Sequence, residues 1–272
     1  MTYELGIIGA GNMAEAIVSG VMRAGLLRRE QILAANRNPA RLADFVARTG
    51  VTPTTDNAAV AAGCRVVLLS VKPAKFGEVL RGIAPAANAD AVYVSVAAGI
   101  STRFIETAMG DRHAWRVIRT MPNTPMSVGE GAVGLCRGAY ATDADVAAVR
   151  RLFASCAEVI EVPEDKIDAV TAVSGSGPAY FFFLVEQMVK AGVEMGLSES
   201  QARALAAKTA LGAGKMLTAG EPPPDAAELR RRVTSPNGTT HAAITTLQSA
   251  GVDDAIVRAV MAAAARAKEL AV

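Results

Sequence analysis

The sequence predicts an α/β protein in which a doubly wound parallel sheet precedes an all-helical region. Short runs of β-branched and apolar residues alternate with longer amphipathic stretches as far as residue 163, and such alternation is typical of a parallel sheet with helices on both faces. A glycine-rich turn joins the first apolar run to the first amphipathic stretch. After Pro163 we find no convincing strand pattern. We therefore expect two domains, at residues 1–163 and 164–272.

The spacing of apolar residues predicts the elements of the first domain. Compact apolar runs predict strands at residues 5–8, 32–35, 66–69, 92–96, 115–118, 132–135 and 159–162. Helices are expected between them at residues 12–24, 39–48, 73–82 and 101–109, and after the Thr-Asp-Ala-Asp sequence that begins at Thr142. In the first of these helices, apolar residues recur with the spacing of a single helical face.

Long helices are expected to form the second domain. Residues 165–195 have a mostly helical pattern that is interrupted or kinked at residues 175–178 and ends at Gly196. Ser198 and Gln201 form the capping-box pattern that begins the next helix. After a loop at residues 220–224, two further helices are expected from about Thr239 and from about Asp253. Because these helices are rich in alanine and other apolar residues, they need a partner to cover them, and we expect a homodimer.

The composition excludes several classes of protein. Hydrophobic residues make up 51% of the 272 residues and charged residues 20%, which excludes a disordered or fibrous chain. The net charge of +2 and the aromatic content of 4% argue against nucleic-acid binding. The start of the chain lacks the basic segment of a signal peptide, and no apolar run approaches the roughly 18 residues of a membrane span. Three widely spaced cysteines, with no C-x-x-C pair, favour a reducing compartment. We expect a cytoplasmic protein with no membrane partner.

The turn Gly9-Ala10-Gly11-Asn12-Met13-Ala14 has the form G-x-G-x-x-A, follows the first expected strand and opens the first expected helix. In this context the first glycine allows the tight turn, the second lets the backbone approach a pyrophosphate, and the alanine lets helix and strand pack closely. The N-terminus of the helix then faces the phosphates. The sequence therefore predicts a Rossmann dinucleotide-binding domain.

The second expected strand ends at Asn36-Arg37-Asn38, where an NAD-binding domain would carry an acidic residue for the ribose hydroxyls. No acid is present here. Asn36 can donate hydrogen bonds and Arg37 can bind a 2′-phosphate, although a solvated loop arginine would give the same pattern. NADPH is therefore the expected cofactor, with NADH as the weaker alternative.

Further candidate residues lie where other expected strands end, at the edge where open α/β sheets bind ligands. Lys72, in Ser-Val-Lys-Pro, could contact a cofactor or act as an acid. A solvated lysine before a helix is the alternative interpretation. Small side chains at Ala97 and Ala98 leave room for a nicotinamide ring. Residues 119–125, stiffened by two prolines, either shape a wall of the cleft or form a structural turn. The two histidines lack metal-ligand spacing, so no metal is expected, and a hydride transfer needs no protein nucleophile.

Residues 235–240, Ser-Pro-Asn-Gly-Thr-Thr, precede an expected helix. They offer a glycine turn, two threonine hydroxyls and free amides at a helix N-terminus, which suit a carboxylate. An ordinary N-cap is the alternative interpretation of the same residues.

Together these segments resemble the pyrroline-5-carboxylate reductases over essentially the whole chain. The motifs that carry the resemblance, in the family's order and spacing, are Gly-Ala-Gly-Asn-Met-Ala, Ser-Val-Lys-Pro, Met-Pro-Asn-Thr-Pro, Ser-Gly-Ser-Gly-Pro-Ala-Tyr and Val-Thr-Ser-Pro-Asn-Gly-Thr-Thr. The resemblance implies a Rossmann domain followed by a helical dimerisation domain, with the dimers often assembled into a decamer. It also implies reduction of (S)-1-pyrroline-5-carboxylate to L-proline, the last step of proline biosynthesis, with NADPH or NADH.

The resemblance further implies the residues of the site. The implied cofactor-binding residues are Ile8, Gly9, Ala10, Gly11, Asn12, Met13, Asn36, Arg37, Asn57, Val71, Lys72, Pro73, Ala97 and Ala98. The implied substrate-binding residues are Glu221, Gly238, Thr239 and Thr240, with Thr240 as the catalytic partner of the imine nitrogen. The sequence departs from the family at Asn237, where a glycine is common, and in the longer loop that begins at Glu221.

Two alternative functions fit part of this pattern. A β-hydroxyacid dehydrogenase or a related imine reductase would share the two-domain plan, but the general-base lysine of the hydroxyacid enzymes would fall at Phe181 of this sequence. A non-enzymatic NADP(H) sensor would need the dinucleotide site and no substrate pocket, and residues 235–240 argue against it. NADPH oxidation in the presence of pyrroline-5-carboxylate distinguishes all three.

Overall fold

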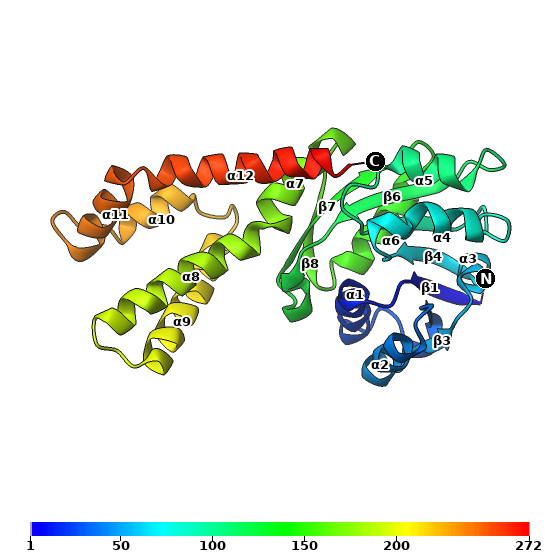
Figure 1. Cartoon of the computed structure of the whole chain (residues 1–272), viewed down its shortest axis with the longest axis horizontal. Coiled ribbons are helices and arrows are strands. Elements are labelled where there is room, and N and C mark those ends of the chain that lie inside the picture. The colour runs from blue at the N-terminus through cyan, green and yellow to red at the C-terminus, as the bar shows by residue number, and fades with distance from the viewer. Residues whose placement is uncertain (1, 272) are drawn as a thin grey trace. The chain divides into compact units, whose positions relative to one another are not determined.

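The computed structural model describes residues 2–271 and contains one eight-stranded sheet with the strand order β3-β2-β1-β4-β5-β6-β7-β8 (Figure 1). The strands are β1 (Tyr3–Ile8), β2 (Ile32–Ala35), β3 (Thr52–Thr54), β4 (Cys64–Leu69), β5 (Val92–Ser95), β6 (Arg116–Met121), β7 (Gly131–Arg137) and β8 (Ala157–Glu161). All pairs are parallel except β6 with β7. The doubly wound α/β fold class is therefore confirmed.

Helices cover both faces of this sheet because its strands are apolar on both sides. The helices are α1 (Asn12–Arg23), α2 (Pro39–Thr49), α3 (Asn57–Gly63), α4 (Phe76–Ile83), α5 (Thr102–Met109) and α6 (Asp143–Phe153). One buried cluster joins β1 residues to side chains of α1, α2 and α6, and a second joins β4 residues to side chains of α3, α4 and α5. Each helix therefore buries its apolar face against one side of the sheet.

Three features of this unit differ from the sequence-based expectation. β7 runs antiparallel to β6 because the link between them, residues 122–130, is too short for a helical crossover. β3 was not expected; it contains Pro53, and it lies at the edge of the sheet, where proline is tolerated. The short helix α3, which begins after the N-cap Asp56, was also not expected.

Residues Gly177–Ala262 form a second compact unit by their internal contacts. It contains α8 (Gly177–Glu194), α9 (Glu199–Leu217), α10 (Ala226–Arg232), α11 (Thr239–Ser249) and most of α12 (Val252–Glu269). The all-helical character is confirmed for residues 177–262, and α10 is an addition to the expected helices. The expected domain boundary after residue 163 stays a prediction.

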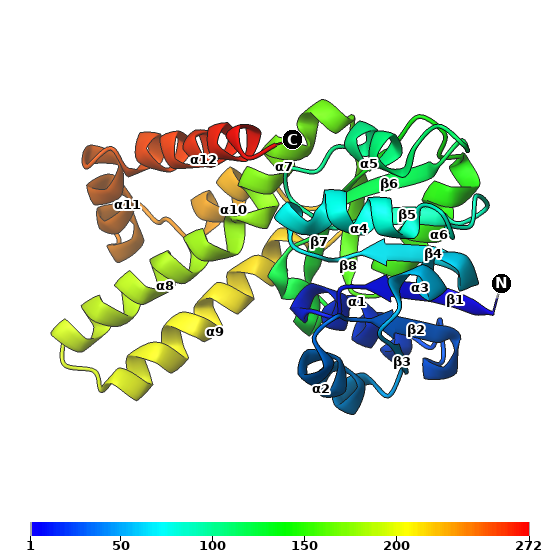
Figure 2. The same ribbon diagram turned by 45° about the vertical axis from the view of Figure 1, so that its right-hand side comes forward.

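Helices α8 and α9 lie side by side as an antiparallel pair (Figure 2). Their backbones approach closely, because a Cβ atom at Gly192 would lie 2.9 Å from the Cβ of Ala202. The expected capping box begins α9: the Ser198 hydroxyl accepts a hydrogen bond from the Gln201 amide, and the Gln201 side chain accepts one from the Ser198 amide. No helix within residues 2–271 is both long enough and apolar enough to span a membrane.

The kink expected at residues 175–178 overlaps the end of a π-helical segment, Thr171–Gly175, just before α8. Such a segment disturbs the regular pattern of helical hydrogen bonds. The side chain of Asn123 donates a 3.0 Å hydrogen bond to the Ser174 carbonyl and accepts one of 2.9 Å from the Ala132 amide. Asn123 is nearly buried, so the Met-Pro-Asn-Thr-Pro segment acts here as a structural connection between β7 and the π-helical segment.

Large apolar side chains are exposed along the helices of the second unit. Phe181, Phe182 and Phe183 on α8 are 60–67% exposed, and Val257 and Met261 on α12 are 63% and 66% exposed. Exposed apolar surface of this extent is characteristic of a surface that a partner covers.

We predict that the smallest folded form of this protein is a dimer. Burial of the α8 and α12 side chains against a second copy would contribute a large part of the stability, so folding and association should be coupled. Sedimentation equilibrium at micromolar concentration should show no folded monomer. A well-folded monomer with a sharp, concentration-independent melting transition would contradict this prediction.

Candidate active site

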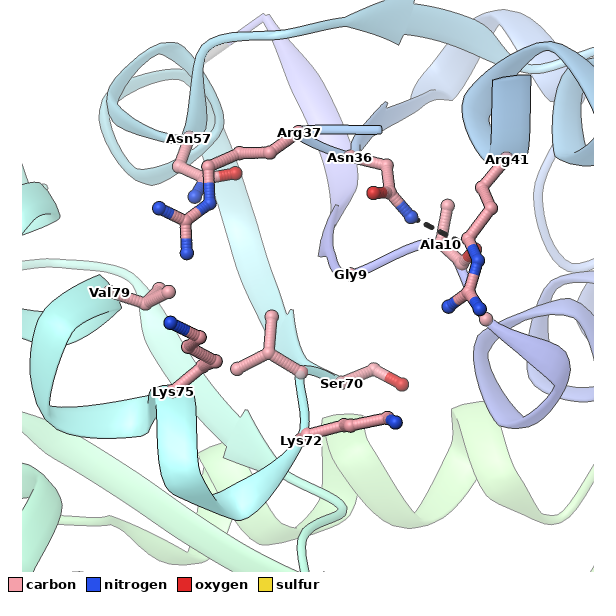
Figure 3. A pocket seen from close by; sticks show the side chains of 12 residues that line it. Gly9, Ala10, Asn36, Arg37, Arg41, Asn57, Ser70, Lys72, Lys75 and Val79 are labelled. Atoms are coloured by element: carbon pink, nitrogen blue, oxygen red, sulfur yellow. Dashed lines mark hydrogen bonds between the residues drawn. The ribbon is translucent and has the colours of Figure 1, made fainter. Parts of the chain in front are cut away.

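The candidate dinucleotide site lies where the chain crosses from one side of β1 to the other. β1 has β2 on one side and β4 on the other, and ligands bind at such a switch point, outside the carboxyl ends of the strands. Two adjoining pockets occur here, with volumes of about 220 and 630 Å³, and they share Ala10, Gly11 and Ser70 among their lining residues. Figure 3 shows the smaller pocket.

The glycine turn has the geometry that its sequence predicts. Gly9 has φ = +100°, its amide donates a 2.9 Å hydrogen bond to the Ala35 carbonyl, and a Cβ atom there would lie 2.6 Å from the Ser70 carbonyl oxygen. Both the dihedral angle and the close packing therefore require glycine.

Gly11 differs from Gly9, since it faces open space. It is the extended N-cap of α1, and apart from its two chain neighbours no atom of residues 2–271 lies within 4 Å of where its Cβ would be. No side chain caps α1, so the first N–H groups of this helix remain available to an anion. The turn fits the pyrophosphate of a dinucleotide.

Asn36, at the end of β2, is tied to its surroundings on both sides. Its amide nitrogen donates a 3.3 Å hydrogen bond to the Ala10 carbonyl (Figure 3), and its oxygen accepts one from the Asn38 amide. Asn38 in turn caps α2 by accepting from the Arg41 amide. Asn36 therefore fixes the glycine turn relative to the end of β2.

Four cationic side chains line the smaller pocket: Arg37, Arg41, Lys72 and Lys75. Arg37 extends toward Asn57 and the α4 side, whereas Arg41 lies on the opposite side, near Ala10 (Figure 3). A pocket with four cations and two asparagines suits a ligand with several phosphates.

Arg41 and Lys75 lie outside the residues that the sequence singled out. Each follows a recognised residue by one helical turn, because Arg41 is four residues after Arg37 and Lys75 is three residues after Lys72. Their position directly after strands that end at the site was a signal that could have identified them. The other additional lining residues are Ser70 and Val79 in the smaller pocket and Asp44, Arg48, Ser70 and Val96 in the larger one.

The structure brings together nearly all of the implied cofactor-binding residues. The smaller pocket is lined by Gly9, Ala10, Gly11, Asn36, Arg37, Asn57, Val71 and Lys72, and the larger one adds Asn12, Met13, Pro73, Ala97 and Ala98. The exception is Ile8, whose side chain is fully buried and whose carbonyl accepts a hydrogen bond from the Ser70 amide. Ile8 therefore lies buried beneath the glycine turn and helps to hold β4 beside it.

The implied substrate-binding residues lie in the helical unit. Asn237 has φ = +61°, a conformation that glycine adopts freely and asparagine more readily than most residues, so the departure from glycine is accommodated.

The start of α11 follows this turn. A Cβ at Gly238 would lie 2.6 Å from the Ser235 hydroxyl oxygen. Gly238 is the N-cap of α11 and offers no side chain to its N–H groups. Thr239 and Thr240 open the helix, Thr239 exposed and Thr240 half-buried. Glu221 lies exposed in the loop between α9 and α10.

The cysteines take no part in these pockets. Cys64, Cys136 and Cys156 are buried and free, and burial raises the pKa of the Cys64 and Cys136 thiols to about 12. Such thiols remain protonated and unreactive at neutral pH. Residues 2–271 contain no group of three or more histidine, cysteine or acidic side chains arranged to hold a metal ion.

Comparison with known proteins identifies the family. The family model for pyrroline-5-carboxylate reductase dimerisation matches residues 164–270, and the pyrroline-5-carboxylate reductase of Pseudomonas aeruginosa is 41% identical over 99% of this chain and 97% of its own length. The chain belongs to the pyrroline-5-carboxylate reductase family. The resemblance read from the motifs is confirmed.

Solved structures of this family extend the similarity to the fold. The pyrroline-5-carboxylate reductase of Coxiella burnetii superimposes with a TM-score of 0.91 at 36% identity, covering 100% of both chains. The Plasmodium falciparum enzyme, solved with NADP bound, superimposes with a TM-score of 0.87 at 27% identity, covering 99% of this chain and 98% of its own.

A second family model, for coenzyme F420-dependent NADP oxidoreductases, matches residues 4–99. Every residue that lines the two pockets of the sheet unit falls within this range. The protein is therefore a nicotinamide-dinucleotide-dependent oxidoreductase with a dimerisation domain.

Proposed function

We propose that this protein reduces (S)-1-pyrroline-5-carboxylate to L-proline and that it prefers NADPH to NADH. The single observation that carries the proposal is the full-length match to pyrroline-5-carboxylate reductases. The turn at Gly9 and Gly11, the uncapped α1 and the cationic pocket supply the dinucleotide site that this reaction requires.

The residues of the sheet unit hold and orient the dinucleotide. The N–H groups that begin α1 bind the pyrophosphate, and Arg37 binds the 2′-phosphate of the adenosine ribose with Asn57 beside it. Small side chains at Ala97 and Ala98 leave space along the larger pocket for the nicotinamide side, next to Val71 and Pro73. When bound, the cofactor supplies the hydride.

The residues of the helical unit hold the substrate. The N–H groups that begin α11 bind the carboxylate, since Gly238 leaves them uncapped and the helix dipole favours an anion there. The Thr240 hydroxyl bonds to the ring nitrogen, whose proton is either already present on the bound imine or taken from solvent as the hydride arrives at the neighbouring carbon. Glu221 lies near the substrate.

An assay of the purified chain tests this proposal. NADPH oxidation should depend on pyrroline-5-carboxylate, and the product should be L-proline. Oxidation of a β-hydroxyacid in place of this reaction would favour the dehydrogenase alternative, which Phe181 at the position of the general-base lysine already disfavours. Dinucleotide binding without turnover of any imine would favour the sensor.

We also infer that the dimers assemble further into a decamer, as the resemblance implies. The match to the dimerisation model supports a homo-oligomer. Light scattering on the purified protein should give a mass about ten times that of the 28.1 kDa chain.

We predict that Arg37→Ala removes most of the preference for NADPH. A charge-assisted hydrogen bond to the 2′-phosphate exists only with NADPH, so the ratio of kcat/KM with NADPH to kcat/KM with NADH should fall by about 10-fold, equivalent to about 1.4 kcal/mol. Steady-state kinetics with both cofactors measures the ratio. An unchanged ratio would show that the 2′-phosphate binds elsewhere.

A further inference from the structure

Glu78, on α4, connects two cations of the smaller pocket that come from different segments. Its Oε1 accepts a 2.5 Å hydrogen bond from Nη1 of Arg37, which follows β2, and its Oε2 accepts one of 3.2 Å from Nζ of Lys75, which precedes α4. The carboxylate itself does not line the pocket. Glu78 therefore holds Arg37 against the α4 side of the pocket from outside the ligand volume.

The charge of Glu78 is constant under assay conditions. Its hydrogen bonds with Arg37 and Lys75 lower the pKa of the carboxyl to about 2, so the group is ionised at every pH at which the enzyme would be studied. The side chains of Arg37 and Glu78 are 55% and 51% exposed. An ion pair this exposed contributes little net free energy, so a stronger anion can take Arg37 from it.

We propose that Glu78 is a specificity-determining residue that lowers the preference for NADPH over NADH. This inference rests on the proposed function, in which Arg37 binds the 2′-phosphate. The carboxylate competes with that phosphate for the Arg37 guanidinium and offsets the positive charge of Lys75. NADH carries only a hydroxyl at the same position, so it binds without disturbing the pair.

Glu78→Gln separates the charge of this residue from its geometry. Glutamine has nearly the same shape and keeps an oxygen that can accept from Arg37. The substitution removes the negative charge that opposes the phosphate, and it leaves the donors of Arg37 and Lys75 in place. Affinity for NADP⁺ should therefore rise, whereas affinity for NAD⁺ should stay nearly constant.

Calorimetric titration of the full-length protein with NADP⁺ and with NAD⁺ tests the inference. We expect Glu78→Gln to lower the Kd for NADP⁺ by roughly 3- to 10-fold, as expected for one removed charge near a phosphate dianion in a solvated pocket. The Kd for NAD⁺ should change by less than about 2-fold. In an Arg37→Ala background the effect of Glu78→Gln on the Kd for NADP⁺ should become smaller, because the competition for the guanidinium is gone and only the offset of the Lys75 charge remains.

Glu161→Gln is the matched control. Glu161 on β8 also makes an ion pair, with Arg137 at 2.8 Å, but it lies toward the opposite end of the strand order from β2. The Glu161→Gln substitution changes the net charge by the same amount as Glu78→Gln. It should leave the Kd values for NADP⁺ and NAD⁺ unchanged, since salt screens charges at such distances. An unchanged or raised Kd for NADP⁺ in Glu78→Gln would overturn the inference. Failure of the unsubstituted protein to bind either dinucleotide would instead overturn the proposed function.

Discussion

Gly11→Val should abolish productive dinucleotide binding and leave the protein folded. Within residues 2–271, the Cβ of the added side chain meets no atom within 4 Å other than those of its two chain neighbours, and the N-cap backbone is extended, with φ = −116°. It would instead project into the space where a pyrophosphate must approach the start of α1. We expect kcat/KM with NADPH to fall by at least about 100-fold, equivalent to about 2.7 kcal/mol, with an almost unchanged melting temperature.

Gly63→Val provides the matched control for this substitution. Gly63, at the end of α3, also has no atom of residues 2–271 within 4 Å of its missing Cβ apart from its chain neighbours and its own helix backbone, and it lines neither pocket of the sheet unit. It should therefore retain both stability and kcat/KM. Calorimetry with NADP⁺ measures the effect of each substitution on dinucleotide binding, and thermal unfolding measures its effect on stability. A Gly11→Val protein that binds NADP⁺ as tightly as the unsubstituted one would show that the pyrophosphate lies elsewhere.

The elements that the sequence predicted well are those that its local pattern specifies. The apolar runs of the central strands are buried on both faces, and the capping pattern at Ser198 is local to one turn. The elements that it missed are short or depend on tertiary context. α3 is brief, and Pro53 in β3 opposes a strand assignment unless the edge position is known. The antiparallel direction of β7 follows from where the chain returns, which no local pattern encodes.

The same distinction applies to the candidate site. The glycine turn is a backbone feature, and so its residues could be recognised from spacing alone. Arg41, Lys75 and Glu78 carry ordinary surface charges in the sequence. That Arg41 and Lys75 line one pocket, and that Glu78 contacts two of its cations, depends on how α2 and α4 lie beside the ends of β2 and β4. Asn237 is a different case. Its residue type departs from the family, and yet it adopts the left-handed conformation that the turn needs.

Thr240→Val should lower kcat/KM for pyrroline-5-carboxylate by roughly 10- to 100-fold, the effect of one lost hydrogen bond in a desolvated site. Valine keeps the shape and the β-branching of threonine at the second position of α11, so the helix should form normally. The hydroxyl is the only group that the substitution removes. Affinity for NADPH should hardly change, because the pockets that suit the dinucleotide are built from the sheet unit.

Two variants show whether the Thr240 hydroxyl itself is responsible. Thr240→Ser keeps the hydroxyl and should restore most of kcat/KM, whereas Thr239→Val should cost less than Thr240→Val, since the exposed Thr239 contributes mainly its backbone amide. Steady-state kinetics with pyrroline-5-carboxylate measures turnover of the substrate, and calorimetry with NADP⁺ measures binding of the dinucleotide. Undiminished kcat/KM in Thr240→Val, or a loss confined to NADP⁺ binding, would mean that the ring nitrogen is held by a group other than the hydroxyl at the start of α11.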